Sequence, residues 1–199
     1  MPDFTEQTRR TFLLSGAAAA GGLAAAPDFS FAQQLSPTPE CKDGHEPTQR
    51  QSDGPFYKPR SPQRADLREP GSAGRAMELS GLVLTRSCKP VAGALVDLWH
   101  ADEIGDYDNS GFRYRGHQFT DAQGRYTFRT IMPAVYTGRT RHFHVKVQAP
   151  NQPILTTQLY FPDEPQNRRD GMFRRELLMR MANREGEPTA RFDFLLDLA

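Results

Sequence analysis

The stretch HFHVKVQ, residues 142–148, decides the fold class, because two kinds of side chain alternate along it. Successive side chains of a β-strand point to opposite faces, so residues i and i+2 share one face. The apolar residues at every second position therefore predict a strand that packs against a core: Phe143, Val145 and Val147. The same alternation places His142 and His144 together on the other face of the strand.

Five further stretches show similar short alternation and are separated by turn residues: MELSGLVL (77–84), VAGALVDLW (91–99), RYTFRTI (125–131), ILTTQLYF (154–161) and RFDFLLDL (191–198). Many short strands with polar turns between them predict an all-β protein built as a β-sandwich. One stretch, residues 172–182, predicts a short C-terminal helix instead. Its apolar residues Phe173, Leu177 and Met181 stand four positions apart, as on one face of a helix.

The first 32 residues predict an export signal. Arg9 and Arg10 precede an apolar, Gly- and Ala-rich stretch, which is too short for the ~20 residues that span a bilayer. Small residues then indicate cleavage after Ala32. The pattern resembles a twin-arginine (Tat) signal, so we expect a periplasmic or extracellular protein. An uncleaved anchor and a Sec signal stay open as alternatives.

The chain after the signal divides in two. Residues 33–75 are rich in Pro, Gly, Gln and Ser and lack periodicity, which predicts an extended N-terminal arm. Residues 76–199 carry the strand pattern and form the expected β-sandwich core. In an oxidising compartment Cys41 and Cys88 can form a disulfide, but no spacing decides this, and the question stays open.

The overall charge argues against two classes of partner. The formal net charge is +1 in 199 residues, which gives no electrostatic reason to expect nucleic acid or, after cleavage of the signal, a membrane surface.

The two histidines of the first stretch suggest a metal site. Two imidazoles on one strand face can chelate one ion, although a polar strand face can carry them by chance. Tyr107, in the polar loop sequence DLWHADEIGDYDN, and Tyr136, six residues before His142, extend the donor set. Ferric iron favours anionic oxygen and can hold a phenol as phenolate below its usual pKa of about 10. Zinc and calcium prefer other ligand sets, so we expect one Fe(III) per chain.

Several motifs in order resemble the intradiol ring-cleavage dioxygenases, the family of protocatechuate, catechol and hydroxyquinol dioxygenases. The resemblance spans about Gly54 to Phe161 and rests on five segments: GPFY (54–57), VDLWHADEIGDY (96–107), TDAQGRYTFRTIMPAVY (120–136), RTRHFH (139–144) and LTTQLYF (155–161). It implies the prealbumin-like type of β-sandwich. It also implies cleavage of a catechol-type ring between its two hydroxyl-bearing carbons with O2, giving a muconate-type diacid.

The resemblance implies four iron ligands, which are Tyr107, Tyr136, His142 and His144. Tyr136 corresponds to the family's axial tyrosinate, which leaves the metal when substrate binds and can accept a substrate proton.

The resemblance also assigns residues around the metal. The active-site arginine falls on Arg139, the glutamine of the next strand on Gln158, and a pocket residue on Trp99. Arg141, beside His142, is a second candidate for the arginine. Only five residues separate Tyr136 from His142, where the family commonly has a longer insertion.

The partners implied are a catechol-type substrate, O2 and a second copy of the chain in a homo-oligomer. Because family members are mostly cytoplasmic, the export signal indicates an atypical branch. Two alternatives stay open: a non-catalytic transthyretin-like β-sandwich binding module, and a zinc or copper enzyme built on the same strand.

Overall fold

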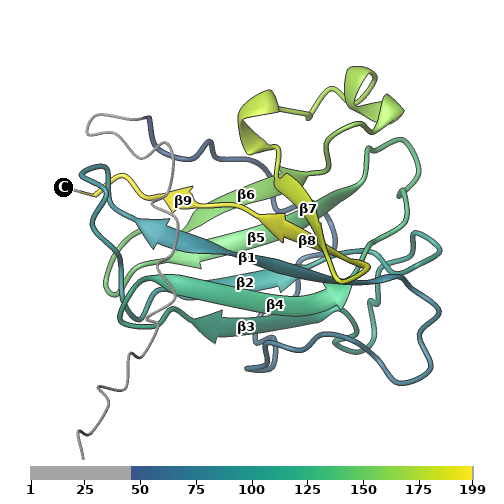
Figure 1. Cartoon of the computed structure of the whole chain (residues 1–199), viewed down its shortest axis with the longest axis horizontal. Helices are drawn as coiled ribbons and strands as arrows, with labels where there is room; N and C mark the ends of the chain where they lie inside the picture. Colours follow the sequence, from purple (N-terminus) through teal and green to yellow (C-terminus); the bar gives the residue numbers. More distant parts are fainter. Residues whose placement is uncertain (1–45, 199) are drawn as a thin grey trace, which may run out of the picture. The chain divides into compact units, whose positions relative to one another are not determined.

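Two β-sheets pack face to face in the computed structural model, which describes residues 46–198 (Figure 1). The predicted signal, its cleavage site and the start of the arm lie outside the described residues. Cys88 is disulfide-bonded, whereas Cys41, the other cysteine that the sequence left open as its partner, lies outside the described residues. No helix among residues 46–198 has the length and hydropathy to cross a membrane.

The first sheet has the strand order β4-β1-β8-β7, with β9 paired to β1. Strand β1 is antiparallel to β4 and parallel to β8 and β9. The strands are β1 (Ala76–Leu84), β4 (Arg125–Ile131), β7 (Arg180–Arg184), β8 (Glu187–Arg191) and β9 (Phe194–Leu195).

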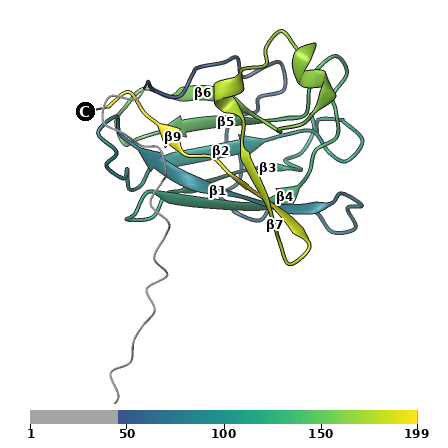
Figure 2. The ribbon, with the colours of Figure 1, turned by 45° about the horizontal axis from the view of Figure 1, so that its top comes forward.

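The second sheet has the order β3-β2-β5-β6, and all its neighbouring strands are antiparallel. Its strands are β2 (Leu95–Trp99), β3 (Arg115–Phe119), β5 (His142–Gln148) and β6 (Leu155–Tyr160). Figure 2 shows the two layers from a second direction.

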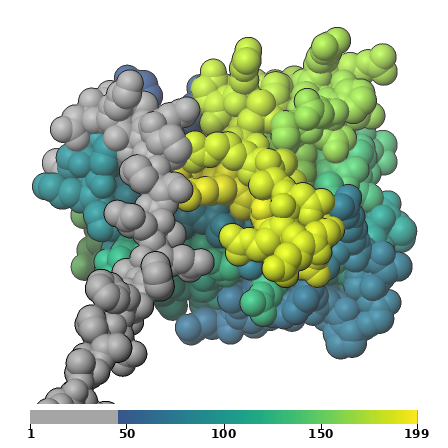
Figure 3. Space-filling view, in the orientation of Figure 1, coloured from purple at the N-terminus to yellow at the C-terminus, as the bar shows by residue number. Residues whose placement is uncertain are grey.

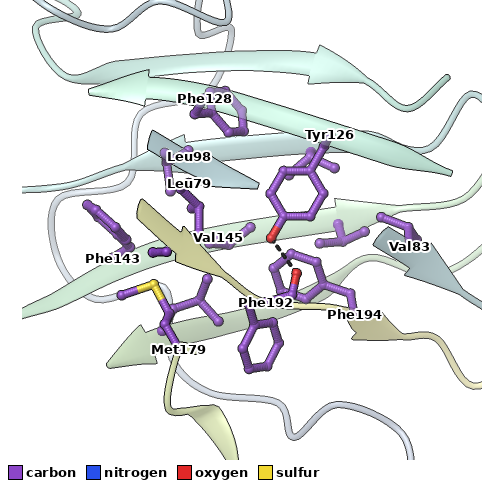
Figure 4. Packing of buried hydrophobic residues seen from close by; sticks show 14 of the residues in the cluster. Leu79, Val83, Leu98, Tyr126, Phe128, Phe143, Val145, Met179, Phe192 and Phe194 are labelled. Atoms are coloured by element: carbon purple, nitrogen blue, oxygen red, sulfur yellow. Dashed lines mark hydrogen bonds between the residues drawn. The ribbon is translucent and has the colours of Figure 1, made fainter. Parts of the chain in front are cut away.

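The core lies between the sheets, as the alternation predicts. Phe143, Val145 and Val147 of β5 are buried there, and Figure 4 shows the first two packed among apolar side chains of the other sheet. In the same view the Tyr126 hydroxyl donates a hydrogen bond of 2.8 Å to the carbonyl oxygen of Phe192. The predicted β-sandwich is therefore confirmed.

The arm covers the outer face of the second sheet. Two partly buried hydrogen bonds hold it to β6: the Thr157 hydroxyl donates to the Gln49 carbonyl (2.7 Å), and, on the outer face, the Gln158 amide donates to the Ser52 carbonyl (2.9 Å). His142 and His144 lie on this outer face of β5, and both are buried. The outer face of the second sheet, beneath the arm, is therefore an enclosed layer in which these polar groups lie beside a cluster of aromatic rings.

Residues 62–67 of the arm form a strap between the two sheets. The His117 amide of β3 donates to the Pro62 carbonyl (3.0 Å), and the Leu67 amide donates to the Arg129 carbonyl of β4 (2.8 Å). Isolated bridges pair Gln63 with His117 and Asp66 with Arg129. The strap thus joins an edge of each sheet.

The helix predicted over residues 172–182 is wrong. The segment contains one short 3-10 turn, η2 (Arg175–Leu177), and then enters β7. The Met179 amide donates to the Tyr160 carbonyl of β6 (2.9 Å), and Leu177 and Met179 are buried two positions apart. Backbone pairing with a neighbouring strand therefore decides this segment, and the spacing of four between apolar residues does not.

Strand β3 and the hairpin of β7 and β8 were not predicted. Strand β3, RGHQF, shows no apolar alternation in the sequence, and backbone pairing with β2 on one side and with the strap on the other forms it. The hairpin turns at Glu185 and Gly186, which both have positive φ, 52° and 91°.

Candidate metal centre

Three of the four predicted ligands meet at one point. His142 and His144 lie on β5, and their Nε2 atoms are 3.0 Å apart. The Tyr107 hydroxyl, from the loop after β2, lies 3.2 Å from the same His142 Nε2 atom. Residues from two separate parts of the chain therefore bring two nitrogen donors and one oxygen donor together.

The fourth predicted ligand, Tyr136, lies beside this cluster. Its ring contacts the Tyr107 ring edge to face, with ring centroids 5.7 Å apart. Phe56 of the arm joins both tyrosines: it stacks on Tyr107 at 4.5 Å and meets Tyr136 edge-on at 5.3 Å. Tyr107 is buried and Tyr136 is half-buried, so Tyr136 stands on the more open side of the cluster.

The two tyrosine-bearing loops touch through their backbones. The Ala134 amide donates to the Asp102 carbonyl (2.8 Å). Gly105 has φ +98°, and a Cβ there would lie 2.6 Å from the Val135 carbonyl oxygen. Only glycine fits this close approach without strain.

His142 is oriented for metal binding. Its Nδ1–H donates to the Thr140 carbonyl at 2.6 Å, which leaves the lone pair of Nε2 facing the cluster. Burial lowers the pKa of His142 to about 4. The imidazole is therefore neutral near pH 7, as a metal ligand must be.

His144 is held by packing. Its ring stacks on Trp99 with centroids 5.0 Å apart and an interplanar angle of 8°, and its buried Nδ1 atom has no hydrogen-bond partner. Burial lowers the pKa of His144 well below its usual range. Trp99, which the resemblance assigns to the pocket, thus packs directly on a predicted ligand.

The donor set fits a hard, highly charged cation. Burial raises the pKa of the Tyr107 phenol, opposed by the positive charges of Arg139 and Arg115, so an added cation is required to ionise it near neutral pH. Two ligand nitrogens at right angles around a metal, each about 2.1 Å from it as in zinc sites, lie about 3 Å apart. The 3.0 Å between the two Nε2 atoms matches this separation. Among residues 46–198, no group of three or more His, Cys, Asp or Glu could hold a metal. The residues present therefore fit Fe(III), with the phenols completing the ligand set.

Arg139 and Gln158 lie together beside the cluster. Arg139 donates through Nη2 to Gln158 Oε1 (2.7 Å) and through Nε to Asp170 Oδ2 (2.8 Å). Arg141 is held elsewhere, because its Nη1 donates to the Pro133 carbonyl (2.8 Å) and its Nε pairs with Glu164 (2.9 Å). The geometry therefore favours Arg139 over Arg141 as the arginine of the site.

Sequence reasoning missed two residues of the site environment. Asp170 is almost fully buried against Arg139, and it lies in a segment without a recognisable pattern. Arg115 is 1 % exposed and donates to the carbonyls of Phe56 (2.6 Å) and Asp108 (3.0 Å). It therefore ties the arm to the Tyr107 loop, a role that only the folded contacts reveal.

Comparison with known proteins identifies the family. The C-terminal sequence model of the family described as "Dioxygenase" matches residues 52–198. Catechol 1,2-dioxygenase 2 of Acinetobacter lwoffii is 34 % identical over 63 % of this chain and 56 % of its own length. Hydroxyquinol 1,2-dioxygenase of Rhizobium sp. (strain MTP-10005) is 31 % identical over 60 % of this chain and 50 % of its own length. The chain spans about half the length of these curated relatives.

Solved structures show the same likeness. The dioxygenase domain of a dioxygenase–carbohydrate-binding fusion protein from Streptomyces sp. SirexAA-E is 51 % identical, with a TM-score of 0.75 over 77 % of this chain and 100 % of that one. Catechol 1,2-dioxygenase of Pseudomonas arvilla C-1 is 29 % identical, with a TM-score of 0.67, and the match covers 74 % of this chain and 61 % of that one. Together with the family match, these likenesses show that the chain belongs to the dioxygenase family of the intradiol ring-cleaving enzymes.

Proposed function

We propose that the protein is a non-haem Fe(III) intradiol dioxygenase. It cleaves a catechol-type ring between the two hydroxyl-bearing carbons with O2 and releases a muconate-type diacid. The observation that carries the proposal is the convergence of His142, His144 and Tyr107 beside Tyr136. The names of the relatives, which include catechol and hydroxyquinol dioxygenases, support this substrate class.

Tyr107, Tyr136, His142 and His144 would hold the iron. Two phenolates and one hydroxide would balance the charge of Fe(III), so the buried centre would be neutral overall. When bound, Fe(III) would supply a Lewis acid that makes the catechol reactive toward O2.

The protein side chains supply proton transfer and charge stabilisation. Tyr136, on the more open side of the cluster, would be the residue that accepts a proton from the substrate. Arg139 places a fixed positive charge next to the site, where it stabilises negative charge that develops on the substrate ring. Phe56 and Trp99 keep water away from the donors because their rings pack directly on Tyr107 and His144.

The rival functions make different predictions for purified protein. Iron-loaded protein should be red-brown from tyrosinate-to-ferric charge transfer, and it should consume O2 when a catechol is added, with a diacid as product. A zinc enzyme or a transthyretin-like binding module would be colourless. Protein that takes up no iron and consumes no O2 with any catechol would overturn the proposal. The binding module is disfavoured because it does not require these four side chains to converge.

We also propose that the protein is exported through the Tat route, as the sequence of the first 32 residues indicates. Replacing Arg9 and Arg10 by lysine should trap the protein inside the cell, which immunoblots of cell fractions measure. Unchanged export of this double variant would contradict Tat dependence.

We also propose that the protein forms a homo-oligomer, as the family resemblance implies. Sedimentation velocity on the purified protein tests this.

A further inference from the structure

Asp170 lies between η1 (Pro165–Arg168) and η2, in the segment whose yellow-green atoms stand at the top of the space-filling view (Figure 3). Its side chain is nevertheless only 3 % exposed. Both carboxylate oxygens accept hydrogen bonds: Oδ1 from the Met172 amide (2.9 Å), and Oδ2 from Arg139 Nε (2.8 Å) and the Thr140 amide (2.9 Å). A buried carboxylate with three donors is fixed in place.

The hydrogen bond from Arg139 to Asp170 orients the guanidinium. Asp170 holds the Nε edge of the guanidinium, and Gln158 holds Nη2. Gln158 is itself fixed, because it is fully buried and its amide donates to the Ser52 carbonyl (2.9 Å). Since the guanidinium is planar, two anchors set its plane and its direction.

The hydrogen bond from the Thr140 amide to Asp170 connects the carboxylate to His142, a proposed metal ligand. Asp170 accepts the Thr140 amide, and the carbonyl of the same residue accepts Nδ1–H of His142 (2.6 Å). The Thr140 side chain is held from the same segment, since its hydroxyl donates to Asn167 Oδ1 (2.7 Å). Thr140 is fully buried, so Asp170 fixes the group that decides the tautomer and the plane of the His142 ring.

We propose that Asp170 is a positioning residue shared by both halves of the centre: it directs Arg139 at the substrate and, through Thr140, holds His142 toward the metal. The inference rests on the proposed dioxygenase function for the Arg139 half. The segment between β6 and β7 is then part of the active site, although it contributes no ligand.

The test compares Asp170→Asn with Arg139→Ala and with the double variant. Asp170→Asn should release iron to a chelator about 10- to 100-fold faster than wild type, as is usual when the partner of a metal ligand is lost, and its kcat should fall. Arg139→Ala should lower kcat but release iron at the wild-type rate. The double variant should release iron like Asp170→Asn, and its kcat per bound iron should be close to that of Arg139→Ala, because the guanidinium that Asp170 directs is already absent.

Asp193 provides the matched control. It is also a buried carboxylate that accepts a backbone amide, from Leu82 (2.9 Å), and pairs with the arginines Arg180 (3.0 Å) and Arg191 (3.3 Å), but it lies between β8 and β9 of the first sheet. Asp193→Asn should lower the melting temperature and leave iron release and kcat unchanged. If Asp170→Asn matched wild type in both readouts, or if Asp193→Asn changed both equally, Asp170 would have only a general structural role.

Two measurements on wild-type protein apply even if Asp170→Asn fails to fold. In metal-free protein, nitrogen-15 NMR should show His142 protonated on Nδ1, and the Thr140 amide should exchange slowly with solvent. The opposite tautomer or a rapidly exchanging amide would overturn the proposal. Wild type that binds iron without cleaving any catechol would instead refute the proposed function, and the iron-release comparison would still test the His142 half.

Discussion

Gly105 shows how much of the site depends on one backbone position. It holds the Tyr107 loop directly against the Tyr136 loop at a φ of +98°. Gly138, in the second loop, also has positive φ (+79°), but no atom lies within 4 Å of the place where its Cβ would stand. Alanine substitution at Gly138 therefore measures the free-energy cost of an unusual φ alone, whereas substitution at Gly105 adds the cost of pushing the two loops apart.

Gly105→Ala should destabilise the protein by about 1–3 kcal/mol from backbone strain alone, and it should also reduce iron binding because the two tyrosines move apart. Gly138→Ala should cost about 1–2 kcal/mol and leave the iron content unchanged. Urea unfolding and iron stoichiometry measure both effects. Equal iron loss in the two variants would show that loop contact at Gly105 is unimportant.

The two arginines beside His142 should also differ. Arg139→Ala removes no ligand, so colour should persist while kcat falls on the order of 100-fold, as for loss of one fixed stabilising group. Arg141→Ala should mainly reduce stability, because Arg141 contacts the Pro133 carbonyl and Glu164. Steady-state kinetics with a catechol decide between them, and an inactive Arg141→Ala beside a fully active Arg139→Ala would reverse the assignment.

Residues within one motif could be predicted, whereas partners from distant segments could not. His142 and His144 share a strand face by simple alternation, and the ordered motifs placed Tyr107 and Tyr136 with them. Asp170 meets Arg139 only because the segment after β6 folds back over β5 and β6, a contact that no local pattern encodes.

At the scale of elements, local periodicity decided the fold only where a strand faces the core. Strand β5 follows its alternation because its apolar side packs between the sheets. Strand β3 and residues 172–182 do not follow their local patterns, because the arm and β6 supply their backbone partners. Tertiary hydrogen bonds outweighed intrinsic preference in both segments.

The arm should behave as part of the site. Trp99 is the only tryptophan of the chain, it is 2 % exposed, and it packs against Tyr57 of the arm as well as His144, with ring centroids 4.9 Å and 5.0 Å apart. A variant that begins at Lys58 should show red-shifted Trp99 emission, faster quenching by acrylamide and loss of bound iron. Emission and quenching equal to those of the full chain would show that the arm does not enclose the site.

For the whole molecule, His100, a buried histidine that is not a predicted ligand, contributes to the response to acid together with His142 and His144. His100 donates from Nδ1 to the Ala101 carbonyl (2.7 Å) and accepts from the Thr130 hydroxyl at Nε2 (2.6 Å). Burial lowers its pKa from 6.5 to about 4. Between pH 4 and pH 6.5, His100 therefore binds a proton in the unfolded chain but not in the folded protein.

The free energy of unfolding should therefore be fully maintained above pH 6.5 and fall as the pH drops toward 4, by about 3 kcal/mol for this group. His100→Gln should be less stable at pH 7 but should lose less stability on acidification. Urea unfolding of metal-free protein at a series of pH values between 4 and 7 measures the difference. Parallel pH curves for the two proteins would contradict the role of His100.

The strap of residues 62–67 also bears on solubility. An exposed strand edge offers unpaired amide and carbonyl groups to any other chain that can form a strand. The strap occupies the free edges of β3 and β4, and Gln51 and Met179 bond to the free edge of β6. Among the described strands this leaves β7 as the open edge, a short one that carries Arg180 and Arg184. A chain cut after Leu67 would uncover the edges of β3 and β4 and would also remove the Gln51 contact from the edge of β6, and we expect it to associate edge to edge into aggregates.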